Sequence, residues 1–217
     1  MVEKKQEPTK LSRHPLVAIV VGFLLTGIAG TWLSNFYSER QIERDRFEQI
    51  TEARRAALQE FATLIYHRLT RAQMLASSLR RSAPLEELKE RKRLYDDAFV
   101  DWGSTLQANL FLIRSVMESE GYSDFERHVE FRLVPILREV DACLTRAFDE
   151  RLRGHGTKAI LQDCDITNSL QLALDCSYAI TDGLFQLAAP IEPLSLPEAE
   201  RRRSSANREI KKKCGGT

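Results

Sequence analysis

The side chains best suited to chemistry are four cysteines, at Cys143, Cys164, Cys176 and Cys214. Cys164 and Cys176 fall on one predicted helix, about 18 Å apart along its axis, which is too far for a disulfide. Cys143 and Cys164 face each other across a predicted hairpin but a helical turn out of register, so a bridge between them stays open. No Cys-x-x-Cys pair indicates a zinc or thioredoxin-like site. We expect buried core thiols, which are typical of a reducing compartment.

The histidines do not form a recognisable metal site. A di-iron bundle needs Glu-x-x-His on two helices, but the residues three before His67 and His128 are Leu64 and Phe125. His155 is expected to be exposed in a glycine-flanked turn. The sequence therefore predicts no metal-binding histidine.

One acidic segment resembles the start of a calcium loop, at Asp163, Asp165 and Thr167. The loop would need glycine at Asn168 and glutamate at Leu174, so the match fails. Nucleophile elbows, phosphate loops and glycine-rich dinucleotide turns are missing from the sequence. We expect no catalytic, cofactor-binding or metal-binding residue, no cofactor and no small-molecule substrate, and hence a protein that is not an enzyme.

The elements around these residues begin with an apolar segment. Residues 15–38 contain 24 consecutive positions without a charge, and Leu16–Leu33 is the most apolar part. A helix needs about 20 such residues to cross a bilayer, so we predict a retained transmembrane helix with interfacial aromatic residues at its end. A cleaved signal peptide and a soluble core helix are the alternatives.

The distribution of charges weakly predicts the orientation of the transmembrane helix in the membrane. The net charge of +1 is the sum of +2 in the basic flank 1–14, −5 in residues 15–197 and +4 in residues 198–217. Four basic residues precede the apolar segment and three follow it closely, which favours a cytoplasmic N-terminus at the cell membrane by one residue. The expected free thiols point the other way, so the side of the helical domain stays open.

Beyond the apolar segment the sequence predicts helices only. Residues 39–55 form a charged helical stalk, either a solvated helix or a self-associating coiled coil, and residues 56–189 form the bundle domain. Apolar residues recur at helical spacing to about residue 81, then over 85–117, from Ser123, and from Thr157 to Pro190. The fold class is all-α: a single N-terminal transmembrane helix that continues into an up-down-up-down four-helix bundle.

Single residues predict the helix ends. We expect Ser82 and Thr157 to cap helices, Gly121 to end one, and Pro135 to cause a kink or break near Val134.

Residues 190–217 read as a proline-containing linker and a disordered basic tail. The residues predicted to contact anionic lipid are Arg201, Arg202, Arg203, Arg208, Lys211, Lys212 and Lys213. A solubilising tail without a partner is the alternative. Nucleic acid is not an expected partner, since no aromatic residue is interleaved for base stacking.

These features favour function by binding. We expect a single-pass membrane-anchored protein that acts as a scaffold or subunit of a membrane complex. Its partners would be the lipid bilayer and another membrane or membrane-associated protein, or a second copy of itself. A membrane-tethered sensory bundle is the alternative, and a membrane-active effector is the third hypothesis.

Overall fold

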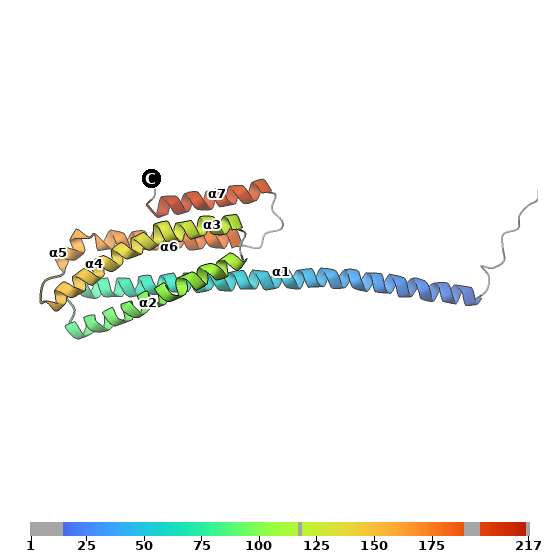
Figure 1. The fold of residues 1–217 in the computed structure, drawn as a ribbon, viewed down its shortest axis with the longest axis horizontal. Helices are drawn as coiled ribbons and strands as arrows, with labels where there is room; N and C mark the ends of the chain where they lie inside the picture. Colours follow the sequence, from blue (N-terminus) through green and yellow to red (C-terminus); the bar gives the residue numbers. More distant parts are fainter. Residues whose placement is uncertain (1–14, 117–118, 189–195, 216–217) are drawn as a thin grey trace, which may run out of the picture. The chain divides into compact units, whose positions relative to one another are not determined.

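The computed structural model describes residues 15–116, 119–188 and 196–215. Throughout these ranges the chain is helical with short turns and no strand, which confirms the all-α class. In chain order the elements are α1 (Pro15–Arg80), α2 (Leu85–Val116), α3 (Ser119–His128), the π-helical turn η2 (Val129–Leu133), α4 (Val134–Leu152), α5 (Lys158–Asp163), α6 (Ile166–Ala188) and α7 (Leu196–Lys213) (Figure 1).

The chain divides into two units, residues 1–49 and residues 50–217. The second unit is a helical bundle. In it the C-terminal part of α1, then α2, then α3 with α4, and then α6 run in alternating directions, and α7 lies against α6 (Figure 1).

The first unit contributes the N-terminal part of α1. The flank 1–14 and the side chains of most apolar residues in 15–38 lie outside the described part of the chain. Within the described part, no helix combines the length and apolarity needed to cross a membrane. The stalk predicted over 39–55 is helical, and residues 40–50 are all exposed, including Phe47 and Ile50.

Ser82 ends a helix rather than capping the next one, which corrects the sequence prediction. Its φ of 53° is left-handed. The N–H of Ser82 donates to the carbonyl of Leu79 at 3.2 Å, and the N–H of Ala83 donates to that of Ser78 at 3.0 Å. This pair of bonds satisfies the last carbonyls of α1 and turns the chain into α2.

The break expected at Pro135 is present. Pro135 has no N–H and its ring crowds the carbonyl four residues earlier. The backbone responds with the π-helical turn η2, in which the N–H of Val134 donates to the carbonyl of Val129, five residues before it. The wider turn gives the proline ring room within an otherwise continuous helical segment.

Two other predicted boundaries were wrong, and a third is in the predicted place without the expected side-chain cap. The third helix starts at Ser119 and runs through Gly121, which therefore does not end a helix. The expected fourth helix is two, because Asp165 adopts a left-handed φ of 45° between α5 and α6. Thr157 precedes α5 without capping it through its side chain, since its buried hydroxyl donates to the carbonyl of Leu79 at 2.8 Å.

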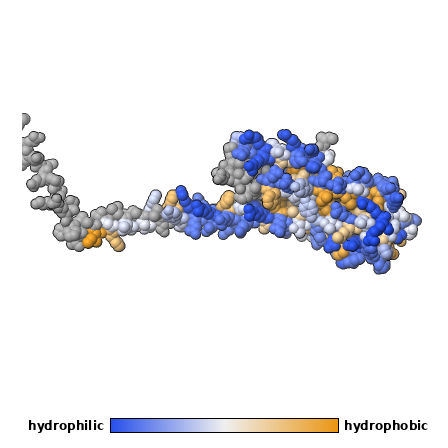
Figure 2. All heavy atoms as spheres, turned by 180° about the vertical axis from the view of Figure 1, so that it is seen from behind, coloured by the Kyte–Doolittle hydropathy of each residue, from blue (hydrophilic) through white to orange (hydrophobic). Residues whose placement is uncertain are grey.

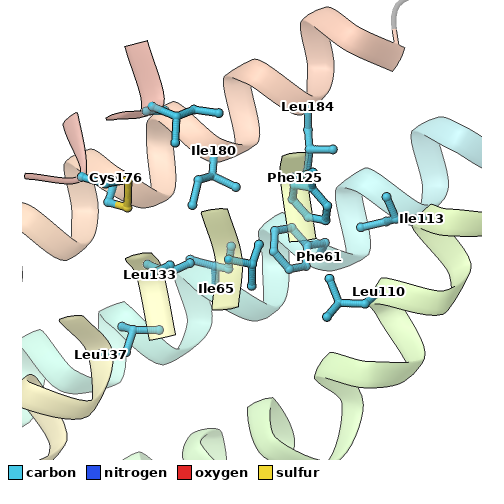
Figure 3. Close-up of a cluster of buried hydrophobic side chains, with 14 of the residues drawn as sticks. Phe61, Ile65, Leu110, Ile113, Phe125, Leu133, Leu137, Cys176, Ile180 and Leu184 are labelled. Carbon is cyan, nitrogen blue, oxygen red and sulfur yellow. A yellow bond between two sulfur atoms is a disulfide. The ribbon is translucent and has the colours of Figure 1, made fainter. Parts of the chain in front are cut away.

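The core of the bundle consists of two apolar clusters. The first surrounds Phe61, whose ring meets Phe125 edge to face with 5.2 Å between centroids. Figure 3 shows Phe61 and Ile65 of α1 beside side chains of the facing helices. The second surrounds Leu75 and Leu79. The buried α1 residues predicted from helical spacing are confirmed at Ala57, Phe61, Leu69, Ala72, Leu75 and Leu79.

Five residues that helical spacing assigns to the core stripes are exposed instead: Phe47, Ile50, Leu85, Phe99 and Tyr178. Phe99 is exposed on α2 and Tyr178 is exposed on α6. Each lies at the edge of its apolar stripe, where a small rotation of the helix decides whether the side chain faces the core or solvent.

The predicted disordered tail is partly wrong: residues 196–213 form α7. Its apolar stripe is narrow, consisting of Ala206, Ile210 and Cys214 at intervals of four. These side chains are buried, and Gly183 of α6 lets Ile210 approach closely, since a Cβ there would lie 3.0 Å from Ile210 Cδ1. The linker residues 189–195 lie outside the described ranges.

The expectation of free buried thiols was also wrong. Cys143 pairs with Cys164, with Cα atoms 6.1 Å apart, and Cys176 pairs with Cys214, at 4.5 Å. The first pair joins α4 to Cys164, the residue that follows α5, although the sequence had suggested that the two cysteines are a helical turn out of register. The second pair connects α6 to α7, a helix that the sequence analysis did not predict.

Candidate functional site

The seven predicted lipid-contacting residues lie on one helix, α7. Six of them, Arg201, Arg202, Arg208, Lys211, Lys212 and Lys213, are exposed, and Arg203 is partly buried. Arg202 Nη2 lies 3.9 Å from Glu198 Oε1, and Arg203 Nε lies 3.8 Å from Asp124 Oδ2. The helix thus presents a basic surface. The lipid contact itself stays a prediction.

The inner side of α7 contacts a buried histidine. His128, at the end of α3, is only 4% exposed. Its Nε2 donates to Asn207 Oδ1 at 3.0 Å, and Asn207 Nδ2 donates to Asp124 Oδ2 at 2.7 Å. Burial lowers the pKa of His128, and the nearby Arg132 and Lys211 add to this, whereas Asn207 and Asp124 oppose it. The neutral imidazole therefore fits this network.

His128 should make the fold sensitive to mild acid. Because the pKa of His128 is lower in the folded chain than its unfolded value of about 6.5, stability is full above that value and falls as the pH decreases below it. We expect a lower thermal midpoint at about pH 5.5 than at about pH 7.5, and a smaller difference in His128→Gln. Circular dichroism melts of both proteins measure this. An equal difference in both would assign the pH effect to other groups.

A buried charged cluster joins α1, α2 and α4. Arg68, 4% exposed, forms an ion pair through Nη2 with Asp141 Oδ2, and the Tyr95 hydroxyl donates to Asp141 Oδ1. Arg68 Cζ also lies 5.0 Å from the ring centroid of Phe99 and 5.3 Å from that of Trp102. The guanidinium is therefore held by a carboxylate and two aromatic rings.

Burial sets the protonation of this cluster. It raises the pKa of Asp141, although Arg68 and Tyr95 act in the opposite direction, and it raises the pKa of Tyr95, an effect that Asp141 strengthens. The cluster lies between the two apolar clusters of the core, because its neighbours along the helices, Leu69 and Val140, belong one to each. Its geometry suits a structural connection among three helices.

The other predicted polar residues serve local structure. His67 Nε2 accepts from Arg71 Nε at 3.3 Å, and His155, exposed as expected, has Nδ1 2.6 Å from Glu150 Oε2. Asp165 accepts from Asn168 Nδ2 at 2.6 Å in the turn before α6. Among the described residues, no group of three His, Cys, Asp or Glu side chains is placed to hold a metal ion.

The outer face of α2 has an unusual composition for a solvated helix. Residues 102–113 contain no charged side chain. On this stretch and just before it, Phe111 and Val100 are 66% and 62% exposed. An exposed helix face normally carries charges, and one that lacks them is typical of an interface. Hydrophobic areas are also visible among hydrophilic ones on the face of the bundle in Figure 2.

No family model matches the chain, and no curated protein or solved structure matches it either.

Proposed function

We propose that this chain is a single-pass membrane-anchored protein whose helical bundle lies outside the cytoplasm and binds another protein of a membrane complex. The anchor is supported by the sequence: residues 15–38 carry no charge over a length sufficient to cross a bilayer. A cleaved signal peptide would export the same bundle without anchoring it.

The main support for an extracytoplasmic bundle is the pair of disulfides, Cys143–Cys164 and Cys176–Cys214. Disulfides form and persist in oxidising compartments and are rare in the cytosol. The basic flank 1–14 independently favours a cytoplasmic N-terminus. Both signals favour the extracytoplasmic side for the bundle, whereas the free thiols expected from the sequence had argued against it.

Binding is favoured over catalysis by the exposed surface. The outer face of α2 around Phe111, within the uncharged residues 102–113, is the contact surface that we propose, and its occupant is a protein with a matching apolar patch. A second copy of this chain is one outcome of the test. The lipid contact of α7 loses its main support on this side of the membrane, because the anionic surface potential belongs to the cytoplasmic leaflet.

Topology is tested with reporter fusions at Met1 and Thr217. We expect the Met1 fusion to be active only as a cytoplasmic reporter and the Thr217 fusion only as an extracytoplasmic one. A cytoplasmic Thr217 would contradict the proposal. Sodium carbonate extraction of the membranes then separates a retained anchor from a cleaved and released bundle.

Partner binding is tested by cross-linking and affinity capture of the full chain from membranes. We expect Phe111→Ser to reduce the captured partner about tenfold, the typical effect of removing an interface anchor. Phe131→Ser is the matched control, since Phe131 is an equally exposed phenylalanine on another element. Equal capture by wild type and Phe111→Ser would remove α2 as the contact surface.

The sensory alternative keeps the same anchor and location. It adds the requirement that a ligand changes helix packing. Its discriminating observation is a ligand-dependent change in cross-linking between copies, whereas a scaffold would show the same cross-links with and without ligand.

A further inference from the structure

A groove of about 540 Å³ lies along the seam between α1 and α2, within the bundle unit. Its volume is in the range of small-molecule sites. The lining residues are Ala56, Gln59, Glu60, Thr63, Leu64 and His67 of α1, and Asp101, Thr105 and Asn109 of α2.

Asn109 is the most informative residue in this groove. Its side chain is 97% buried, with a relative exposure of 3%. Of the described residues, none forms a hydrogen bond with its amide, although the amide has two donor hydrogens and an acceptor oxygen. The amide atoms are not fully enclosed, so they remain accessible to solvent, and Asn109 is one of the residues that line the groove. The groove therefore holds a polar group that the fold does not use.

The other polar groups of the groove offer mainly hydrogen-bond acceptors. The hydroxyl of Thr63 donates to the carbonyl of Gln59 at 2.7 Å, and that of Thr105 donates to the carbonyl of Asp101 at 2.5 Å. Both hydroxyl protons are thus used, and the oxygens can only accept. Glu60 and Asp101 add two carboxylates from opposite walls.

The described lining contains no lysine or arginine to balance these carboxylates. The nearest cation in the adjoining hollow is Arg71, whose Nε donates to His67 Nε2. An anionic ligand would therefore meet two carboxylates, whereas a cation would be attracted by both. Leu64, Ala56 and the methyl groups of the threonines provide an apolar surface beside them.

We propose that this groove binds a small organic ammonium compound, with a primary amine and a short apolar part. The ammonium group donates to Glu60, Asp101 and the amide oxygen of Asn109, and the apolar part lies against Leu64. A zwitterionic amino acid fits less well, because its carboxylate would have no cation among the lining residues. This inference goes beyond the protein-binding function and requires neither the membrane anchor nor a protein partner.

The test uses the full chain in nanodiscs of zwitterionic lipid, titrated calorimetrically with butylamine, benzylamine and 1,4-diaminobutane. We expect saturable binding of at least one amine with a Kd of about 1 mM or tighter. Butyrate and butanol are expected not to bind. Asp101→Asn should weaken amine binding about tenfold, as the loss of a charge-assisted hydrogen bond does. Asp97→Asn is the matched control, because it removes the same charge one turn away on α2, outside the groove.

Asn109→Leu separates a binding role from a structural one. It should abolish amine binding while the bundle stays folded, with the circular dichroism spectrum of the wild type and a thermal midpoint within about 2 °C of it. The proposal is overturned if no amine binds, if butyrate binds as well as butylamine, or if Asp101→Asn and Asp97→Asn have equal effects. Amine binding by Asn109→Leu equal to that of the wild type would also contradict it.

Discussion

Replacing Arg68 by methionine is expected to destabilise the bundle by about 3–5 kcal/mol at pH 7, the usual effect of breaking a buried ion pair from one side. Methionine retains most of the packing volume but removes the cation that pairs with Asp141, which keeps the hydrogen bond from Tyr95 and the more distant charge of Lys92. Since Arg68 and Asp141 come from α1 and α4, the loss should appear as earlier melting of the whole bundle. Thermal and denaturant unfolding followed by circular dichroism measure it.

The same variant should recover part of its stability in acid. Burial already raises the pKa of Asp141 in the wild type, and removal of the Arg68 cation raises it further. Protonation of Asp141 relieves the uncompensated charge, so the difference between wild type and Arg68→Met should decrease as the pH falls below neutrality. A difference independent of pH would indicate lost packing against Phe99 and Trp102 instead.

A triple variant provides the control for Arg68→Met. Arg68→Met with Asp141→Leu and Tyr95→Phe replaces the polar cluster by apolar side chains, which is often neutral or stabilising for a buried ion pair. We expect its stability to return to within about 1 kcal/mol of the wild type. If the triple variant is as unstable as Arg68→Met, the ion pair is not the source of the loss.

Most of the bundle follows from helical spacing in the sequence. The start of α2 after Pro84 and buried residues of α1 from Ala57 to Leu79 were predictable, because each long helix buries one apolar stripe and proline is tolerated in a first helical turn. The irregular turn before Pro135 was predictable too, because proline has no backbone N–H to donate within a helix. These features depend on interactions within about one helical turn.

The buried polar cluster of Arg68, Tyr95 and Asp141 was not predicted, although the position of Arg68 in the sequence is consistent with burial. Arg68 lies seven residues after Phe61 and seven before Leu75, which places it in the middle of the core stripe of α1. Seven-residue spacing alone does not distinguish a buried arginine from one that extends to solvent. Its partner Asp141 is 73 residues away in the sequence, so the pairing depends on helix packing.

The same reason explains the errors at the C-terminal end. The stripe of α7 has only Ala206, Ile210 and Cys214, and an isolated helix of such composition would not be stable. Its order comes from contacts with α6 at Gly183 and from the bond to Cys176. Asn109 could not be assigned to a groove from the sequence for the same reason. The other side of that groove is formed by residues of α1, and their position opposite Asn109 depends on helix packing.

Removing the Cys176–Cys214 disulfide is expected to release α7 from the bundle. The bond closes a segment with a sequence separation of 38 residues, and loop-closure entropy assigns it about 4 kcal/mol. The other contacts of α7 are the apolar packing of Ala206 and Ile210, the Asn207 hydrogen bonds and the Arg203–Asp124 ion pair. A loss of about 4 kcal/mol raises the population of detached α7 about a thousandfold.

Trypsin provides the measurement, because α7 contains seven lysines and arginines that are protected while the helix is docked. We expect Cys176→Ser/Cys214→Ser to lose α7 rapidly, with the rest of the bundle intact, and the wild type to do the same under reducing conditions. Cys143→Ser/Cys164→Ser is the matched control, as it removes the other disulfide and leaves α7 docked. Equal protection of α7 in all three proteins would mean that packing alone holds it.

The sensitivity of α7 to trypsin also tests the proposed extracytoplasmic location of the bundle. If α7 needs its disulfide, chain that is retained in a reducing cytosol should have trypsin-sensitive α7, whereas chain that has reached an oxidising compartment should not. Since reduction is expected to separate α7, and with it Asn207, from His128 of α3, the compartment in which the protein folds would decide whether that part of the bundle is complete. Protection of α7 in membranes, lost on adding reductant, is therefore the outcome that an extracytoplasmic bundle requires.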